Sequence, residues 1–344
     1  MRISEFVAIE APPVCRKSQK LLIGVDEAGY GPNMGPLTIC ATAWRVPSSF
    51  DASEMTRLLE PEFLAKPIKR DSTHIPIGDS KKIHKDSLAV EGLILGARYL
   101  GFELDGQIAS EWDPRIASFA SLDWNRLAGI PWYAKRPSIH TVVLDQTIAD
   151  QPAYFHAASE KLYRNAIRLA GVRMRVIDEV EFNRQVDLKG KKSTLLSVAS
   201  LELVKQVIGE FANVDEAVEV YCDKHGGRNR YHPILTYVFD EQWFAIEVES
   251  RACSRYATRF DGHAMQIQFK VDGDSIFPSA AASIIAKWTR EELMDRLNGF
   301  WLANVSHRVA ATAGYYVDAL RFAAQIEGAA AKLSLGRDLW WRKK

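Results

Sequence analysis

Short apolar segments typical of strands alternate along this chain with segments whose apolar residues follow helical spacing. Leu21–Glu27 and Leu37–Trp44 predict two strands, and the Gly/Pro-rich stretch 29–36 between them predicts an antiparallel pair. Ala217–Asp223 alternates strictly between apolar and polar residues, as a half-buried strand does. Further strands are expected at Thr141–Asp145, Val172–Ile177, Phe244–Val248 and Met265–Val271.

Helical spacing predicts helices in the longer gaps between these strands. They are expected at Leu88–Leu100, at Ala157–Leu169, after a cap at Ser193 or Thr194, and from Ala280 to about Leu297, with more helix beyond. This alternation predicts an α/β fold. We interpret 1–20 as an N-terminal extension, 21–298 as the core with insertions at about 86–150 and 226–262, and 299–344 as a helical C-terminal region.

Composition places the chain among ordinary globular proteins. Its 344 residues are 47% hydrophobic and 25% charged, and a chain of this length buries a large core. The net charge of +1 excludes bulk attraction to a polyanion, so nucleic acid must be met by a local basic patch or a bound metal. Four dispersed cysteines without a C-x-x-C pair argue against a zinc or redox motif and favour a reducing compartment.

No signal peptide or membrane span is predicted, because the first residues include Glu5 and Glu10 and no apolar run reaches about 18 residues. We therefore expect a cytoplasmic protein with no membrane association, and the sequence indicates no obligatory protein partner. Two loop motifs fail their context. Gly29–Gly35 is one residue too long for a dinucleotide loop and precedes a strand, and Gly190–Thr194 lacks the upstream glycine of a P-loop.

Four acidic residues follow predicted strands and lie beside glycines: Asp26, Glu27, Asp223 and Asp274. Carboxylates in such positions suit Mg²⁺, which takes a few carboxylate oxygens and keeps exchangeable waters. Neighbours on a regular strand point to opposite faces, so Asp26 and Glu27 share a site only if the strand ends or twists there. Taken singly, each acid is also explained as a solvated loop carboxylate or a helix cap. Asp274, for example, lies near the N-terminus of the following helix, where negative charge is favoured.

These acids lie in segments that carry a family resemblance. The segments are Gly24-Val25-Asp26-Glu27-Ala28-Gly29-Tyr30-Gly31-Pro32 with Gly35-Pro36, Asp79-Ser80-Lys81-Lys82-Ile83, Val220-Tyr221-Cys222-Asp223, Gly273-Asp274-Ser275 with the helix Ser279–Lys287, and Ala313-Gly314-Tyr315. In this order they resemble the motifs of the type 2 ribonucleases H, ribonuclease HII and HIII. The resemblance runs from residue 21 to about 322, and the combination of five motifs is highly specific.

The resemblance implies an RNase H-like fold, a mixed sheet flanked by helices. It implies cleavage of RNA in RNA–DNA hybrids, or at ribonucleotides embedded in duplex DNA, leaving 5′-phosphate and 3′-hydroxyl ends. On this basis Asp26, Glu27, Asp223 and Asp274 would bind Mg²⁺ or Mn²⁺, as two ions that activate water and stabilise the leaving oxygen.

The resemblance also assigns substrate contacts. The backbone amides of Gly29, Tyr30 and Gly31 would meet the ribose 2′-OH, the group that distinguishes RNA from DNA. Lys81 and Lys82 would lie against phosphates, and Tyr315 would stack beside the scissile bond. The lysines are equally explained as a solvated pair and Tyr315 as a core aromatic.

The chain departs from the family pattern in several places. Tyr30 replaces the usual arginine between the two glycines, which puts recognition of the DNA–RNA junction in question. Fifty residues separate Asp223 from Asp274, more than ribonuclease HII uses, and Leu320-Arg321 stand where a histidine is expected after Tyr315. These departures indicate a divergent branch.

Several alternatives stay open from the sequence alone. Arg228 or Lys224 would contact the scissile phosphate, or the run 224–228 is a glycine-rich turn with exposed charges. The tail Trp340–Lys344 packs on the body or binds a partner. Besides the endoribonuclease, a structure-selective DNA nuclease or a hybrid-binding protein without activity would fit the fold, although a pure binder gains nothing from clustered acids near phosphate.

Overall fold

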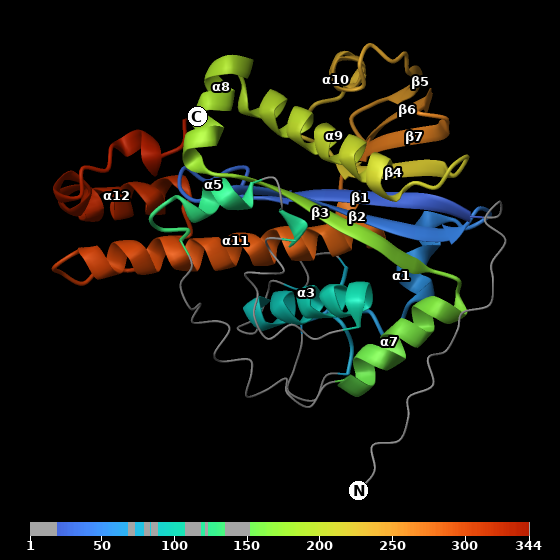
Figure 1. Ribbon diagram of the computed structural model, residues 1–344, viewed down its shortest axis with the longest axis horizontal. Coiled ribbons are helices and arrows are strands. Elements are labelled where there is room, and N and C mark those ends of the chain that lie inside the picture. The colour runs from blue at the N-terminus through green and yellow to red at the C-terminus, as the bar shows by residue number, and fades with distance from the viewer. Residues whose placement is uncertain are drawn as a thin grey trace, which may run out of the picture.

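A seven-stranded mixed sheet forms the centre of the molecule (Figure 1). This computed structural model describes residues 19–67, 73–78, 83, 89–106, 118–120, 123–134 and 152–343, without the side chains of residues 89, 152, 153 and 274. The strand order is β3-β2-β1-β4-β7-β6-β5. The strands are β1 (Gln19–Ala28), β2 (Leu37–Pro47), β3 (Arg168–Ile177), β4 (Ala217–Asp223), β5 (Ala245–Glu249), β6 (Cys253–Phe260) and β7 (His263–Lys270).

Helices cover both faces of this sheet. They are α1 (Met55–Leu58), α3 (Ala89–Asp105), α5 (Trp124–Ala128), α7 (Pro152–Arg164), α8 (Glu179–Lys189), α9 (Lys192–Phe211), α10 (His232–Val238), α11 (Phe277–Asn304) and α12 (Tyr316–Lys332), with 3₁₀ turns at Ala52–Glu54, Gly273–Ser275 and Arg337–Leu339. Figure 1 shows α11, α3 and α7 on one side and α8 to α10 on the other. The expected mixed sheet flanked by helices is confirmed.

The central strands run in the directions that bring their ends together. β1 pairs with β2 antiparallel, as predicted, and β1, β4 and β7 are mutually parallel. The carboxyl ends of β1 and β4 therefore meet at one edge of the sheet.

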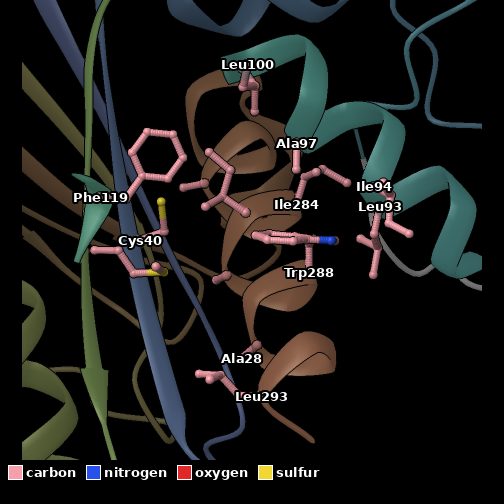
Figure 2. Close-up of a cluster of buried hydrophobic side chains, with 14 of the residues drawn as sticks. Ala28, Cys40, Leu93, Ile94, Ala97, Leu100, Phe119, Ile284, Trp288 and Leu293 are labelled. Carbon is pink, nitrogen blue, oxygen red and sulfur yellow. The ribbon is translucent and has the colours of Figure 1, made fainter. Parts of the chain in front are cut away.

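Each face of the sheet has its own apolar core. On one face, Ile284 and Trp288 of α11 pack between the sheet and Leu93 and Ala97 of α3 (Figure 2). On the other face, α9 packs against the alternate residues of β1, which include Ile23. A strand with both faces buried reads as an almost continuous apolar run, which is why β1 is conspicuous in the sequence.

The start of α11 is fixed directly onto β1 and β4. A Cβ atom on Gly24 would lie 2.0 Å from the carbonyl carbon of Pro278, so only glycine permits this approach. Thr42 donates its hydroxyl hydrogen to the Pro278 carbonyl at 2.7 Å, and Ser279 donates to the Tyr221 carbonyl at 3.0 Å. This contact holds the first turns of α11 beside the ends of the two parallel strands.

Three local predictions were wrong. The helix predicted to reach Leu169 ends at Arg164, because Leu169 pairs with Trp44 of β2 and belongs to β3. The predicted cap of α9 at Ser193 or Thr194 is displaced, since the helix begins at Lys192 and Lys191 occupies the N-cap without a side-chain hydrogen bond. β7 ends at Lys270, so Val271 lies outside the strand.

β6 was not predicted at all. It is hydrogen-bonded on both sides, to β7 and to β5, yet its buried side chains are Ser254 and Tyr256 rather than an apolar series. The segment interpreted as a second insertion thus contains α10, β5 and β6, which extend the sheet beyond β7. The strand predicted at Thr141–Asp145 and the N-terminal residues 1–18 lie outside the described residues.

The C-terminal tail packs on the body, as one of the two alternatives predicted. Trp340 is 3% exposed, and its ring lies 5.9 Å from that of Trp301 in α11 at an angle of 71°. No helix among the described residues has both the length and the apolar character needed to cross a bilayer.

Candidate active site

Asp26 and Asp223 lie at adjacent positions just beyond the last residue pair of β1 and β4. Val25 pairs with Cys222 in parallel register, so the next residue on each strand is one of these acids. Asp26 is buried, and Ser283 and Lys287 of α11 both favour its ionised form. The sequence motif contained Ser283 and Lys287, but no role was assigned to them; their i, i+4 spacing on one helix face was the available signal.

Burial and the charges of neighbouring acids raise the pKa of Asp26 and of Glu27. Burial raises the pKa of Asp26 from 3.8 to about 6, Lys287 and Ser283 oppose this shift, and the charge of Asp223 adds to it. Burial also raises the pKa of Glu27 well above its ordinary value, and the charges of Asp26 and Asp223 raise it further. The three acids therefore form a concentrated negative site that a cation would relieve.

Strand β1 is not interrupted between Asp26 and Glu27. β1 stays paired with β2 through Ala28, and its alternation assigns the Cβ of Asp26 to the α11 face and that of Glu27 to the α9 face. Among the side chains described here, no three His, Cys, Asp or Glu residues form a metal-ligating group. The side chain of Asp274 is not among them.

The backbone of Asp274 nevertheless lies beside Asp223. The Gly273 amide donates to Oδ1 of Asp223 at 3.3 Å, and a Cβ atom on Gly273 would lie 2.9 Å from the Asp223 Cα. The 3₁₀ turn Gly273–Ser275 is thus packed against the end of β4 because Gly273 has no side chain. Three of the predicted acids, and the backbone of the fourth, are brought to one end of the sheet.

Residues 29–35, which we call the glycine loop, connect β1 to β2 beside these acids. Gly29 has φ +87°, and a Cβ atom on it would lie 2.4 Å from the Pro36 oxygen and 2.6 Å from Nε of Arg290. Tyr315 lies next to the loop, 3.8 Å from the position that a Gly31 Cβ would take, and is 58% exposed. The core-aromatic alternative for Tyr315 is therefore wrong, and its ring is accessible beside the loop.

The Tyr30 side chain of the glycine loop lies against residues 224–230, which we call the β4 loop. Its hydroxyl lies 2.9 Å from the position of a Cβ on Gly226, and the Lys192 ammonium lies 5.0 Å from its ring centre. Burial and then the charge of Glu27 raise the pKa of Tyr30, whereas Arg228 lowers it. A pocket of about 340 Å³ opens here, lined by Tyr30, Gly31, Pro32, Asn33, Lys192, Tyr316, Arg342 and Lys343.

The Lys224 ammonium is hydrogen-bonded to groups of the protein itself. Its ammonium donates to the carbonyls of Arg228 and Ser250, to Oδ1 of Asn229 and to Oγ of Ser254, at 3.3, 2.6, 2.9 and 3.2 Å. Three ammonium hydrogens therefore face four acceptors within the protein. A contact of Lys224 with the scissile phosphate would have to replace one of these bonds, and it stays a prediction.

His225 is also structural. It is buried, its Nδ1 lies 3.1 Å from Oγ of Ser197, and burial together with the charge of Arg228 lowers its pKa to about 3. The neutral ring packs edge-on against Tyr231 and Phe269. Arg228 itself is half-buried, near enough to Tyr30 and His225 for its charge to act on both.

Asp223 also borders a second opening. It has a volume of about 460 Å³ and is lined by Asp223, Lys224, Gly227, Asn229, Arg251, Val271 and Asp272. Arg251 comes from the turn between β5 and β6, a position that the sequence did not single out. Lys81 and Lys82, predicted to lie against phosphates, are outside the described residues.

Comparisons with known proteins add structural neighbours only. No protein-family model and no curated protein sequence matches the chain. Similar solved structures include ribonuclease HII of Archaeoglobus fulgidus in complex with PCNA (13% identity, 94% of each chain covered, TM-score 0.38) and ribonuclease H2 of Pyrococcus horikoshii OT3 (14%, 93% and 92%, 0.39). Bst-RNase HIII in complex with Mn²⁺ matches at 17% identity over 95% of this chain and 67% of that one, with a TM-score of 0.42.

Proposed function

We propose that this chain is a metal-dependent endoribonuclease that hydrolyses the RNA strand of RNA–DNA hybrids or ribonucleotides embedded in duplex DNA. The observation that carries this proposal is the placement of Asp26 and Asp223 side by side at the ends of two parallel strands, with the glycine loop next to them. A site of this kind combines metal-ligating carboxylates with backbone that can approach a ribose closely.

The donor set fits a hard divalent cation. Asp26, Glu27 and Asp223 offer only carboxylate oxygens, and burial and mutual repulsion raise the pKa of both Asp26 and Glu27. Together with Asp274 they would hold Mg²⁺ or Mn²⁺, proposed as two ions. Such ions supply an activated water and stabilise the leaving oxygen, which gives 5′-phosphate and 3′-hydroxyl ends.

The surrounding residues would orient the substrate. The amides of Gly29, Tyr30 and Gly31 would bind the ribose 2′-OH, and exposed Tyr315 would stack against the sugar or base beside the scissile bond. Arg228 is proposed to stabilise charge on the scissile phosphate, acting with Lys81 and Lys82 on the backbone of the duplex. Replacing Arg228 by alanine should then lower the cleavage rate or substrate affinity.

Cleavage of three labelled duplexes tests the function: an RNA–DNA hybrid, DNA with one embedded ribonucleotide, and DNA alone. Each is incubated with Mg²⁺, Mn²⁺ or EDTA, using wild type, Asp26→Asn and Asp240→Asn. Asp240 is exposed and pairs with Lys205, so it serves as a matched control. We expect cutting only where ribose and metal are present. Asp26→Asn should lose at least about a hundredfold in rate, the order that one positioned electrostatic group supplies.

Each of the other possible results would indicate a different function for this chain. Cutting of the all-DNA duplex would identify a structure-selective DNA nuclease on this fold. Binding of hybrid without cutting in either metal would identify a hybrid-binding protein. Comparing the hybrid with the single embedded ribonucleotide shows whether Tyr30, in the place of the usual arginine, still permits recognition of the junction.

A further inference from the structure

The glycine loop is held from its inner side by an arginine from the far end of the chain. Nη1 of Arg342 donates to the carbonyls of Gly29 and Gly35 at 2.6 and 3.2 Å, and Nη2 donates to the carbonyl of Tyr30 at 3.1 Å. Arg342 is 1% exposed, and its guanidinium lies 4.0 Å from the ring centre of Phe182 in α8. Neither the loop sequence nor the tail sequence indicates this contact.

The contact sets the direction of two amides because peptide groups are planar. In a trans peptide the C=O of one residue and the N–H of the next point in opposite directions. Arg342 binds the carbonyls of Gly29 and Tyr30 on the inner side, so the N–H groups of Tyr30 and Gly31 must point outward. No hydrogen bond within the described residues uses these two N–H groups. Both residues line the 340 Å³ pocket.

We propose that Arg342 is a positioning residue that presents the Tyr30 and Gly31 amides to the ribose of the substrate, an inference that rests on the function proposed above. The guanidinium acts through the loop, because its Nη1 and Nη2 are bonded to the loop carbonyls. A lysine carries its donors on one nitrogen, so it cannot reproduce the planar fork in which Nη1 bonds to Gly29 and Gly35 while Nη2 bonds to Tyr30.

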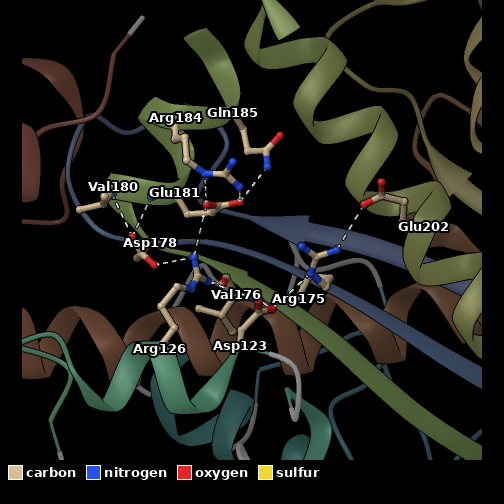
Figure 3. Close-up of polar contacts among 10 residues, drawn as sticks. All are labelled: Asp123, Arg126, Arg175, Val176, Asp178, Val180, Glu181, Arg184, Gln185 and Glu202. Atoms are coloured by element: carbon tan, nitrogen blue, oxygen red, sulfur yellow. Dashed lines mark hydrogen bonds and ion pairs between the residues drawn. The ribbon is translucent and has the colours of Figure 1, made fainter. Parts of the chain in front are cut away.

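The surroundings of Arg342 compensate its charge and fix its position. Glu179 is fully buried, its charge raises the pKa of Arg342 against the lowering effect of burial, and its Oε1 accepts from the Gly35 amide at 3.0 Å. Asp178 caps α8 through the amides of Val180 and Glu181 and pairs with Arg126, as Figure 3 shows, which fixes the turn that carries Glu179.

The tail stays docked without the Arg342 side chain. Its main chain donates to the Asn33 carbonyl at 2.7 Å, and Asn183 of α8 accepts from the Lys343 amide at 2.7 Å. The tail end lies beside α8 in Figure 1. Arg342→Met removes one partner of a buried charge pair and leaves Glu179 without its cation, so it should lower stability. Arg342→Lys keeps the charge, so the position of the loop can be tested in that variant separately from the loss of charge.

The experiment compares wild type with Arg342→Met, Arg342→Lys and Arg337→Met. Arg337 is the matched control: it is exposed, belongs to the same tail and stacks on Trp341 at 4.7 Å without reaching the glycine loop. Hydrogen exchange is measured at the amides of Asn33, Met34 and Gly35, which bond to Gly314 and Glu179. Steady-state cleavage of the hybrid with Mg²⁺ and thermal unfolding are measured in parallel.

For Arg342→Met we expect about tenfold faster exchange of these amides, the size that loss of charged hydrogen bonds implies, with a Tm below that of wild type because Glu179 loses its cation. KM for the hybrid should rise about tenfold with kcat within about twofold, because the amides bind the ribose throughout the reaction. In exchange and KM, Arg342→Lys should resemble Arg342→Met, and Arg337→Met should resemble wild type.

Unchanged exchange and unchanged KM in Arg342→Met would overturn the proposal. If Arg342→Met lost stability, Arg342→Lys decides: full recovery of both KM and exchange by lysine would show that charge and packing suffice and would also overturn it. Faster loop exchange in a chain whose wild type cuts no ribose-containing duplex would leave Arg342 holding the loop and refute the nuclease function instead.

Discussion

The two loops beside the carboxylates are held by different means. The glycine loop is fixed from within by buried groups that belong to three distant segments, namely Arg342, Glu179 and the Gly314 carbonyl. The β4 loop is fixed by groups nearer to it in sequence, mainly the half-buried Lys224 ammonium and the buried hydroxyl of Tyr231, which accepts from the His225 amide at 2.9 Å. The first loop therefore has little freedom to adapt, whereas the second can yield to a substrate.

Two glycines with similar backbone angles test this difference most strongly. Gly29 has φ +87° and Gly227 has φ +77°, but a Cβ on Gly29 meets Pro36 and Arg290, whereas a Cβ on Gly227 meets nothing within 4 Å. Gly227→Ala should lower the free energy of unfolding by about 1 kcal/mol, the cost of the left-handed conformation. Gly29→Ala should lower it by about 2–4 kcal/mol, because overpacking is added. Equal losses in urea unfolding would contradict the comparison.

The acids between the loops should destabilise the metal-free protein. Because the pKa of Asp26 is raised from 3.8 to about 6, the folded state binds more protons than the unfolded state between these values. Stability therefore falls as pH rises through this window, and the cost is complete above pH 6. In EDTA, Asp26→Asn should be more stable than wild type at pH 8, by on the order of 2 kcal/mol, and nearly equal to it below pH 4.

Thermal unfolding at the two pH values measures this effect. A Tm difference that is the same at both would show that charge is not its cause. Mg²⁺ should raise the Tm of wild type more than that of Asp26→Asn, since only an intact ligand set gains from binding to the folded state.

The β4 loop should respond more mildly to loss of its own anchor. Lys224→Met removes the hydrogen bonds to Arg228, Asn229, Ser250 and Ser254. We expect a loss of about 1 kcal/mol, because Lys224 and Asn229 line the 460 Å³ opening, where water can replace the ammonium. Hydrogen exchange at the Arg228 amide, which bonds to the His225 carbonyl, should quicken. Lys192→Met, which loses only a contact with the Tyr30 ring, is the control. A larger loss than in Gly29→Ala would reverse the ranking of the two loops.

The sequence predicted most of the central sheet because its pattern is local. Buried strands such as β1 and half-buried strands such as β4 show their character in a few consecutive residues. β6 was not predicted because a serine and a tyrosine occupy its buried positions. Their burial depends on hydrogen bonds with Asn229, Glu249 and the Tyr231 amide. The end of α7 was misplaced because Leu169 fits the helical period equally well.

The site was predictable only where strand order determines it. Two acids at the ends of predicted strands, read with the family resemblance, indicated the pairing of Asp26 with Asp223. The hydrogen bonds of Arg342 to the glycine loop, and those of Lys224 to Ser250 and Ser254, join residues far apart in sequence. No local pattern indicates such contacts, and so the sequence analysis did not identify the hydrogen bonds of Lys224 or of Arg342.

Gly29 and Arg342 are 313 residues apart in the sequence. During synthesis the glycine loop is therefore made long before the arginine that binds it. At about 5–20 residues per second, roughly 15 to 60 seconds pass between translation of the glycine loop and translation of the arginine that orients it. Throughout that interval the growing chain carries the first acids but lacks the arginine that binds the glycine loop. Chains that stop before Arg342 would keep the same sheet strands and lack the finished loop.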